Sequence, residues 1–327
     1  MADAAASRTG PHTAEHAAAS ATGGSSPSPT GVGSTDPAVT DRAEAGSPFP
    51  PFLPAGRIVR LAGRGEMFVR QHVHPDPAAP TVLLLHGWTA SADLQFIAAY
   101  EALAEVCSFV GVDHRGHGRG LRSFDRYELE DVADDAAAVC RELGLAPVVA
   151  VGYSMGGPVA LHLTRRHPDL VAGLVLQATA LEWRATLRER VAWRLVPLFG
   201  SAIRSWLNPY VLRRGVRTLV RDDSPLAPYR DWLAAETMRN DARVMVEAGK
   251  ALSRYDARPW AASLGVPAGV LVSTRDRLVK PNKQRALAAA VDGDVVEVAM
   301  DHLGAIERPA EFATATVALI RRVAAAD

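Results

Sequence analysis

The chain has 327 residues, of which 48% are hydrophobic, so it can bury a sizeable core in one or two domains. Its formal net charge is zero, which gives no reason to expect nucleic acid or another strongly charged partner. Two cysteines, Cys107 and Cys140, are too few for a disulfide framework. No group of Cys and His residues has the spacing of a metal site, so we expect no metal.

The beginning of the chain differs in composition from the rest. Residues 1–55 are rich in Ala, Ser, Thr, Gly and Pro, and they contain no aromatic residue before Phe49. Such a segment buries too little apolar surface to offset the entropy lost on ordering, so we expect a disordered tail. It lacks the continuous apolar core of a signal peptide, and no later stretch approaches the ~18 apolar residues of a membrane-spanning helix. We therefore expect a cytoplasmic protein.

Beyond the tail, short apolar runs alternate with helical patterns. The predicted strands, in chain order, are Arg57–Leu61, Met67–Val73, Thr81–Leu85, Phe109–Val112, Val148–Val151, Leu174–Leu176, Val270–Val272 and Val295–Val298. The predicted helices are Leu94–Glu105, Leu129–Leu143, Gly157–His167 and Lys283–Ala290. Continuous apolar runs are typical of strands buried on both faces, and alternation with helices implies right-handed crossovers. The sequence thus predicts an α/β fold with a mostly parallel sheet flanked by helices.

Residues 180–259 interrupt this alternation with helical patterns and no good strand. Between Leu181 and Arg258 the chain has fourteen Arg and one Lys against nine Asp and Glu, together with several Trp and Tyr residues. We expect a helical insertion that caps the sheet, which leaves the core domain to residues 56–179 and 260–327. The alternative is an ordinary helical layer whose arginines face solvent.

The motif that carries chemistry is Gly152-Tyr153-Ser154-Met155-Gly156, which fits G-x-S-x-G. A predicted strand precedes it and a predicted helix follows it, as a nucleophile at a sharp strand-to-helix turn requires. Gly152 and Gly156 leave room for neighbouring chain that a Cβ would obstruct. The other interpretation, a tight turn with a small polar cap, explains the serine but not both glycines. We therefore expect Ser154 to be a nucleophile.

A serine nucleophile needs hydrogen-bond donors for the oxyanion of its tetrahedral intermediate. One candidate is the backbone N–H of Met155, directly after the serine. The other is the backbone N–H of Trp88, in the loop His86-Gly87-Trp88 that follows the strand Thr81–Leu85. Gly87 allows the backbone to turn there. We expect His86 to support the loop through hydrogen bonds, although a loop histidine without any catalytic link is the alternative.

The base and its carboxylate partner are identified as a histidine and an aspartate that follow predicted strands of the sheet. His302 and Asp276 each follow a predicted strand, so they lie at the same sheet edge as Ser154. The order Ser, Asp, His is the one expected for this type of site. Asp301 is the rival carboxylate, but its place next to His302 makes a hydrogen bond to the ring geometrically poor. Asp276 paired with Arg275 or Arg277 is the remaining alternative.

Together these elements resemble the α/β-hydrolase superfamily. The match rests on His86-Gly87-Trp88, Asp113-His114-Arg115-Gly116-His117-Gly118, Gly152-Tyr153-Ser154-Met155-Gly156-Gly157, Asp276 and His302, and it covers about residues 57–327. The resemblance implies an eight-stranded sheet, a cap after the sixth strand and a Ser-His-Asp mechanism without a cofactor. Esterases, lipases and cofactor-free haloperoxidases or perhydrolases are the most similar branches. Branches with an aspartate nucleophile, such as epoxide hydrolases and haloalkane dehalogenases, do not fit Ser154.

The expected function is hydrolysis of a carboxylic ester or a related acyl compound. Acyl transfer, including perhydrolysis, and hydrolysis of a carbon–carbon bond are alternatives with the same triad, and a binding protein on this scaffold is a further one. The expected partner is a small, apolar acyl substrate. The excess of Arg with Trp in the insertion also suggests peripheral contact with an anionic lipid surface; aromatic residues that line a pocket or the insertion's own core are the alternative. The sequence gives no indication of the oligomeric state.

Overall fold

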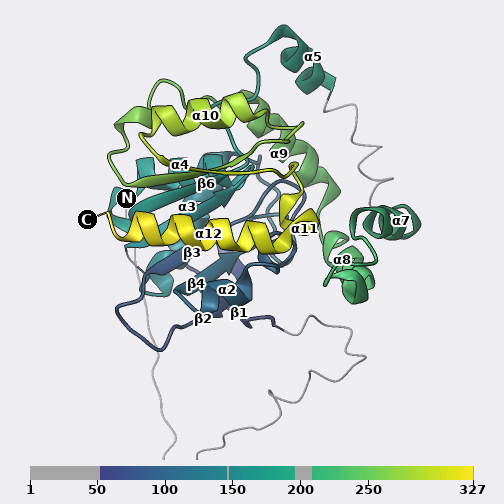
Figure 1. The fold of residues 1–327 in the computed structure, drawn as a ribbon, viewed down its shortest axis with the longest axis horizontal. Coiled ribbons are helices and arrows are strands. Elements are labelled where there is room, and N and C mark those ends of the chain that lie inside the picture. Colours follow the sequence, from purple (N-terminus) through teal and green to yellow (C-terminus); the bar gives the residue numbers. More distant parts are fainter. Residues whose placement is uncertain (1–51, 146, 196–207, 327) are drawn as a thin grey trace, which may run out of the picture. The chain divides into compact units, whose positions relative to one another are not determined.

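A computed structural model describes residues 52–145, 147–195 and 208–326. These residues form an eight-stranded sheet of order β1-β2-β4-β3-β5-β6-β7-β8 (Figure 1). The strands are β1 (Ala55–Leu61), β2 (Gly65–His72), β3 (Thr81–Leu85), β4 (Ser108–Val112), β5 (Val148–Tyr153), β6 (Val171–Gln177), β7 (Ala268–Ser273) and β8 (Asp294–Val298). β1 and β2 pair antiparallel, β2 also runs antiparallel to β4, and every pairing from β4 to β8 is parallel. The predicted strands and the mostly parallel sheet are confirmed.

The helices flank this sheet. They are α1 (Ala92–Phe96), α2 (Tyr100–Ala104), α3 (Leu129–Glu142), α4 (Gly156–Arg166), α5 (Leu187–Leu195), α7 (Pro209–Leu219), α8 (Arg230–Thr237), α9 (Ala242–Arg254), α10 (Pro281–Ala290), α11 (Gly304–Glu307) and α12 (Pro309–Ala324). None of the helices in the described residues has the length and apolar character needed to cross a lipid bilayer.

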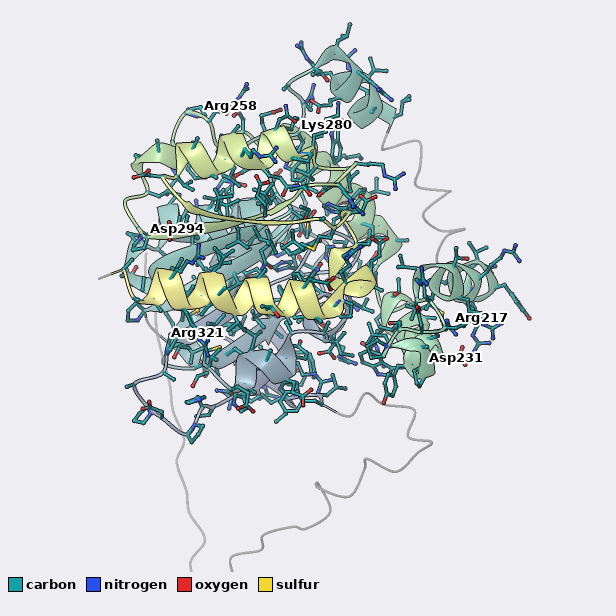
Figure 2. All side chains as sticks on the ribbon, viewed as in Figure 1. Arg217, Asp231, Arg258, Lys280, Asp294 and Arg321 are labelled. Atoms are coloured by element: carbon teal, nitrogen blue, oxygen red, sulfur yellow. The ribbon has the colours of Figure 1, made fainter. Side chains whose placement is uncertain are left out.

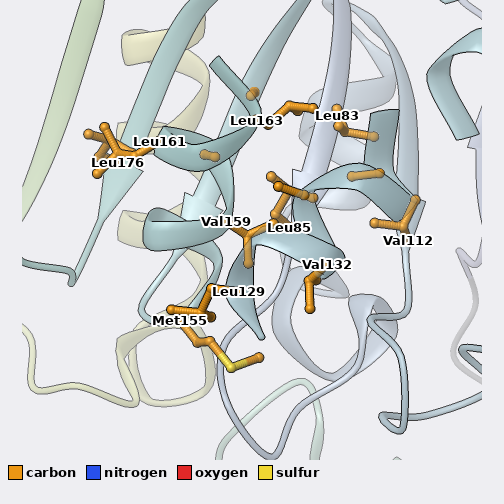
Figure 3. Close-up of a cluster of buried hydrophobic side chains, with 14 of the residues drawn as sticks. Leu83, Leu85, Val112, Leu129, Val132, Met155, Val159, Leu161, Leu163 and Leu176 are labelled. Carbon is orange, nitrogen blue, oxygen red and sulfur yellow. The ribbon is translucent and has the colours of Figure 1, made fainter. Parts of the chain in front are cut away.

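Alternate residues of the central strands enter two separate hydrophobic clusters, one on each face of the sheet. Leu83 and Leu85 of β3 pack with α3, α4 and α10, whereas Val82 and Leu84 pack with α1, α2 and α12. Figure 3 shows part of the first cluster, where Leu129 and Val132 of α3 lie near Val159 of α4 and Leu85. Burial of both faces explains why the central parallel strands are continuous apolar runs.

Two parts of the sequence-based assignment need correction. The single helix predicted over Leu94–Glu105 is two short helices, because residues 97–99 form a turn in which the Ala99 N–H bonds to the Phe96 carbonyl three residues back. The apolar spacing continues through this turn, so the periodicity gave no sign of it. The second concerns the chain after His302, where no helix was predicted. The structure has α11 and the 16-residue α12, whose Phe312 and Leu319 pack on the sheet.

The predicted disordered tail, residues 1–55, lies outside the described residues as far as Pro51. Its last part belongs to the folded unit. Phe52 and Leu53 pack against the hydrophobic clusters, the Pro54 carbonyl accepts a hydrogen bond from Arg70 at 3.0 Å, and Ala55 opens β1.

The predicted insertion lies between β6 and β7. Its described residues contain α5, α7, α8 and α9 and no strand, apart from an isolated bridge between Glu182 and Asp256. α9 buries Val244, Met245 and Leu252 in the same cluster as α3 and α4. α7 and α8 form a smaller cluster with Leu94 of α1 and Ile306 of α11. Within the described residues, the insertion therefore packs on the core through these two hydrophobic clusters.

Three buried histidines join the loops that follow β3 and β4. The His86 Nε2 accepts the backbone N–H of His114 at 2.9 Å, and the His86 Nδ1 donates to the Gly87 carbonyl at 2.7 Å. Only a neutral ring with its proton on Nδ1 does both. Burial lowers the pKa of His114 to about 3 and that of His117 to about 4, and it holds the pKa of His86 well below its usual value.

These histidines predict a specific acid sensitivity. The unfolded chain protonates each imidazole near pH 6.5, whereas the folded chain keeps it neutral. The contribution of these histidines to the free energy of unfolding is therefore fully present above that pH and is lost as the pH falls below it. We expect the free energy of unfolding to fall between pH 7 and pH 5 by about 2 kcal/mol more in the wild type than in His117→Gln, which lacks one such group. Urea unfolding curves at several pH values measure this difference. Equal losses in the two proteins would contradict it.

Candidate active site

Ser154 stands at the turn between β5 and α4. Its φ is +51°, in the left-handed region that non-glycine residues rarely adopt. A Cβ on Gly152 would collide with the Gly156 carbonyl, and a Cβ on Gly156 would collide with the Leu85 carbonyl at the end of β3. The Ser154 N–H bonds to the Gln177 carbonyl of β6 at 2.8 Å. The two glycines therefore allow the close approach of β3, β5 and α4 that holds the serine in a strained turn.

His302 lies between Ser154 and Asp276. Its Nε2 is 3.1 Å from the Ser154 Oγ, and its Nδ1 is 2.8 Å from the Asp276 Oδ2. A carboxylate oxygen only accepts, so Nδ1 carries the proton and Nε2 is left to accept the serine hydroxyl proton. Ser154 and Asp276 are buried, and His302 is half-buried. The three predicted residues thus form one chain of hydrogen bonds.

The Asp276 carboxylate is held from several directions. Its Oδ1 accepts the backbone N–H groups of Leu278 and Val279, both at 2.8 Å, and its Oδ2 accepts the Gln284 amide at 3.1 Å. These donors fix the orientation of the carboxylate toward His302. Gln284, on α10, is fully buried and was not identified from the sequence. No local motif marks it, because its role depends on a contact eight residues away.

Asp301, the rival carboxylate, has other partners. Its Oδ1 accepts the backbone N–H groups of His302 at 2.8 Å and Arg277 at 3.1 Å, and its Oδ2 accepts the Arg277 guanidinium at 2.9 Å. It therefore ties the His302 loop to the Asp276 loop. Tyr153 supports the same loop, because its hydroxyl donates to the His302 carbonyl at 2.6 Å. The Tyr153 contact was also not predicted, although this residue occupies one of the two variable positions of the serine motif.

The expected oxyanion donors, the backbone N–H groups of Trp88 and Met155, belong to the loop after β3 and to the residue that follows Ser154. Gly87 is so close that a Cβ there would be 3.3 Å from the Ser154 Cβ. Met155 anchors the other side, since its buried side chain belongs to the cluster drawn in Figure 3. Within the described part of the chain, the backbone N–H groups of Trp88 and Met155 donate to no protein acceptor. His86 does not contact Ser154 through a hydrogen bond among these residues; it holds the Gly87 carbonyl.

A cavity of about 790 Å³ opens onto Ser154 and His302. Its walls come from the loop after β3, from α1, from α11 and from α7 of the insertion. The apolar lining residues include Leu94, Leu212, Val216, Leu219, Leu303 and Ile306. The polar ones include Gln95, which is nine-tenths buried, and Thr237. Among the described residues, no group of three or more His, Cys, Asp and Glu side chains is arranged to hold a metal ion.

Comparisons with known proteins agree with this architecture. The AB hydrolase superfamily protein YisY of Bacillus subtilis is 25% identical over 232 residues, which are 68% of this chain and 82% of the relative. The bifunctional esterase/perhydrolase DCH of Acinetobacter calcoaceticus is 38% identical over 99 residues, 30% of this chain and 36% of the relative. The solved esterase EaEST of Exiguobacterium antarcticum superposes with a TM-score of 0.70 at 19% identity, covering 82% of this chain and all of that one, which shows a shared fold.

The decisive match is to a family. The sequence model described as the alpha/beta hydrolase fold matches residues 80–309, which include β3 to β8, the insertion, Ser154, Asp276 and His302. This span is more than half of the chain. The protein therefore belongs to the α/β-hydrolase family.

Proposed function

We propose that this hydrolase cleaves a carboxylic ester or a related acyl compound through an acyl-enzyme formed on Ser154. The observation that carries the proposal is the hydrogen-bonded chain Ser154–His302–Asp276 at the wall of an apolar cavity. A nucleophile, a base and a carboxylate that orients the base are the parts that acyl transfer to serine needs. A protein that only binds a ligand has no need of all three.

In this mechanism the Ser154 Oγ attacks the acyl carbon while the His302 Nε2 takes its proton. Asp276 keeps the imidazole proton on Nδ1 and stabilises the imidazolium that forms. The oxyanion accepts hydrogen bonds from the backbone N–H groups of Trp88 and Met155. His302 then protonates the leaving alcohol, and a water molecule repeats the sequence on the acyl-enzyme. The route uses protein groups and water alone.

Removal of the nucleophile tests the mechanism. We expect Ser154→Ala to lower kcat/KM for p-nitrophenyl esters by about 10⁶-fold, as in other triads, because no other group replaces the attacking oxygen. The matched control is Ser123→Ala, at a half-buried loop serine that hydrogen-bonds to Asp125 and does not line the cavity. Initial rates of p-nitrophenolate release measure both variants. Near-native turnover of Ser154→Ala would rule out the serine mechanism.

The cavity lining favours an apolar acyl chain. Each methylene buried in the cavity adds about 0.8 kcal/mol, or about fourfold in kcat/KM, until the space is filled. We therefore expect kcat/KM to rise with chain length beyond acetate and then to level off. Val216→Trp, on the cavity wall, should move the optimum to shorter chains, whereas Val191→Trp, exposed on α5, should not. A series of p-nitrophenyl esters from acetate to palmitate measures the optimum. An unchanged optimum in Val216→Trp would contradict the placement of the acyl chain against this wall of the cavity.

Acyl transfer to an acceptor other than water and hydrolysis of a carbon–carbon bond use the same three residues. Similarity to a protein named as an esterase and perhydrolase supports keeping acyl transfer as the second candidate. Product partitioning on addition of an alcohol or hydrogen peroxide identifies acyl transfer. Turnover of a diketone with almost no turnover of simple esters identifies carbon–carbon hydrolysis.

Peripheral contact with lipid remains a prediction. Leu187, Val191 and Leu195 form an exposed apolar stripe on α5, and Arg213 and Arg214 are exposed on α7. Arg217, labelled in Figure 2, is exposed on the same helix. Trp183 and Trp232 are buried, which favours the alternative that the aromatic residues form the core of the insertion and do not contact lipid. We expect co-sedimentation with anionic vesicles at low salt, and weaker binding when the three arginines are changed to Gln. Absence of binding at low salt would remove this prediction.

A further inference from the structure

The corner between α8 and α9 of the insertion meets the loops of the candidate site. Asn240, in this corner, is 6% exposed. Its Nδ2 donates to the Thr89 carbonyl at 2.8 Å, and its Oδ1 accepts the Gly118 N–H at 2.9 Å. The next residue, Asp241, donates its N–H to the Gly116 carbonyl at 2.9 Å. One carboxamide thus connects the loop after β3 with the loop after β4, and its donor and its acceptor are both used.

The contact with Thr89 falls on a strained residue. Thr89 has a φ of +63°, which is a genuine outlier for a β-branched side chain. Such a conformation persists only when its surroundings hold it in place. The hydrogen bond from Asn240 ends on the carbonyl of this residue. Trp88, whose N–H is the proposed oxyanion donor, directly precedes Thr89, so a change at Thr89 moves that N–H.

A second contact from the insertion reaches the same loop. The Trp88 indole Nε1 donates to the Met245 carbonyl of α9 at 2.8 Å, and the indole packs near Trp193 with ring centroids 6.3 Å apart. From the core side, His86 holds the Gly87 carbonyl at 2.7 Å. The loop Gly87–Thr89 is therefore held by the core at its first residue and by the insertion at its second and third.

We propose that Asn240 is a positioning residue for the reaction: it holds Thr89 in its strained conformation and thereby keeps the Trp88 N–H directed at the oxyanion. The inference rests on the proposed function and assigns the insertion a part in catalysis. Asn240 acts through the loop and does not contact the reacting atoms. Its loss therefore affects stabilisation of the transition state more than binding of the ester.

The test is a near-isosteric change of one atom. Asn240→Asp keeps an acceptor for Gly118 but places a carboxylate oxygen, which cannot donate, against the Thr89 carbonyl. Loss of one oxyanion donor lowers kcat by about 10²–10³-fold, so a displaced donor should cost about tenfold to a hundredfold. We expect this loss in kcat for p-nitrophenyl esters with KM within about threefold of wild type, and a matching loss of affinity for an alkyl boronic acid, which forms a tetrahedral adduct on serine. Asn208→Asp, which changes the exposed cap residue of α7, is the control and should stay within about twofold.

A second variant tests the same loop if Asn240→Asp does not fold. Trp88→Phe removes the indole N–H that bonds to the Met245 carbonyl, together with the five-membered ring that carries it, and keeps the backbone donor and an aromatic side chain. It should show the same fall in kcat with little change in KM. Unchanged kcat in the folded variants, beside a wild type that hydrolyses esters and reacts with a fluorophosphonate, would overturn this inference alone. A wild type that does neither would overturn the proposed function and this inference with it.

Discussion

The turn at Ser154 is the constraint on which the rest of the site depends. A parallel strand that enters a helix within two residues must bend sharply, and here the bend puts a serine at φ +51°. The turn is stable because Gly152 and Gly156 let backbone from three elements come within contact distance, and because the Met155 side chain is anchored in the core. The cost of the strained residue is offset by packing around it, which is the usual arrangement at functional sites.

The sheet supplies the rest of the geometry. β3, β5, β7 and β8 run parallel, so the loops after them meet at one edge. These loops carry Trp88, Ser154, Asp276 and His302. The loops are in turn held by buried polar contacts, such as the two backbone N–H groups on Asp276 and the Tyr153 hydroxyl on the His302 carbonyl. The strands place these candidate groups, and hydrogen bonds between the loops set their orientation.

How far the sequence alone could predict this arrangement depends on the range of each contact. The strands and the positions of Ser154, Asp276 and His302 followed from local patterns, since strand ends and their order along the chain are visible in the sequence. Gln284, Tyr153 and Asn240 could not be found in this way, because their roles come from contacts between segments that the fold brings together. The turn at residues 97–99 was not predicted for a different reason, because the helical spacing of apolar residues continues unchanged from one side of the turn to the other.

The insertion contributes more than a cover for the sheet. Its helix α7 forms one wall of the cavity, and its α8–α9 corner contacts the loop that carries Trp88. In the proposed mechanism, both substrate selection and the alignment of the catalytic groups therefore depend on the insertion, the part of the chain that local sequence patterns describe least well. Differences in this segment can change specificity without any change in the strand-to-helix turn.

The most direct test of the central claim is to identify the residue that reacts with a fluorophosphonate. The full-length protein would be labelled, digested and analysed by mass spectrometry, with Ser154→Ala treated in parallel. The account predicts a single stoichiometric adduct on Ser154 and no adduct in the variant, because, among the serines that the structure describes, Ser154 is the one whose hydroxyl hydrogen-bonds to a histidine ring. An adduct on another residue, or equal labelling of the variant, would contradict a mechanism built on Ser154.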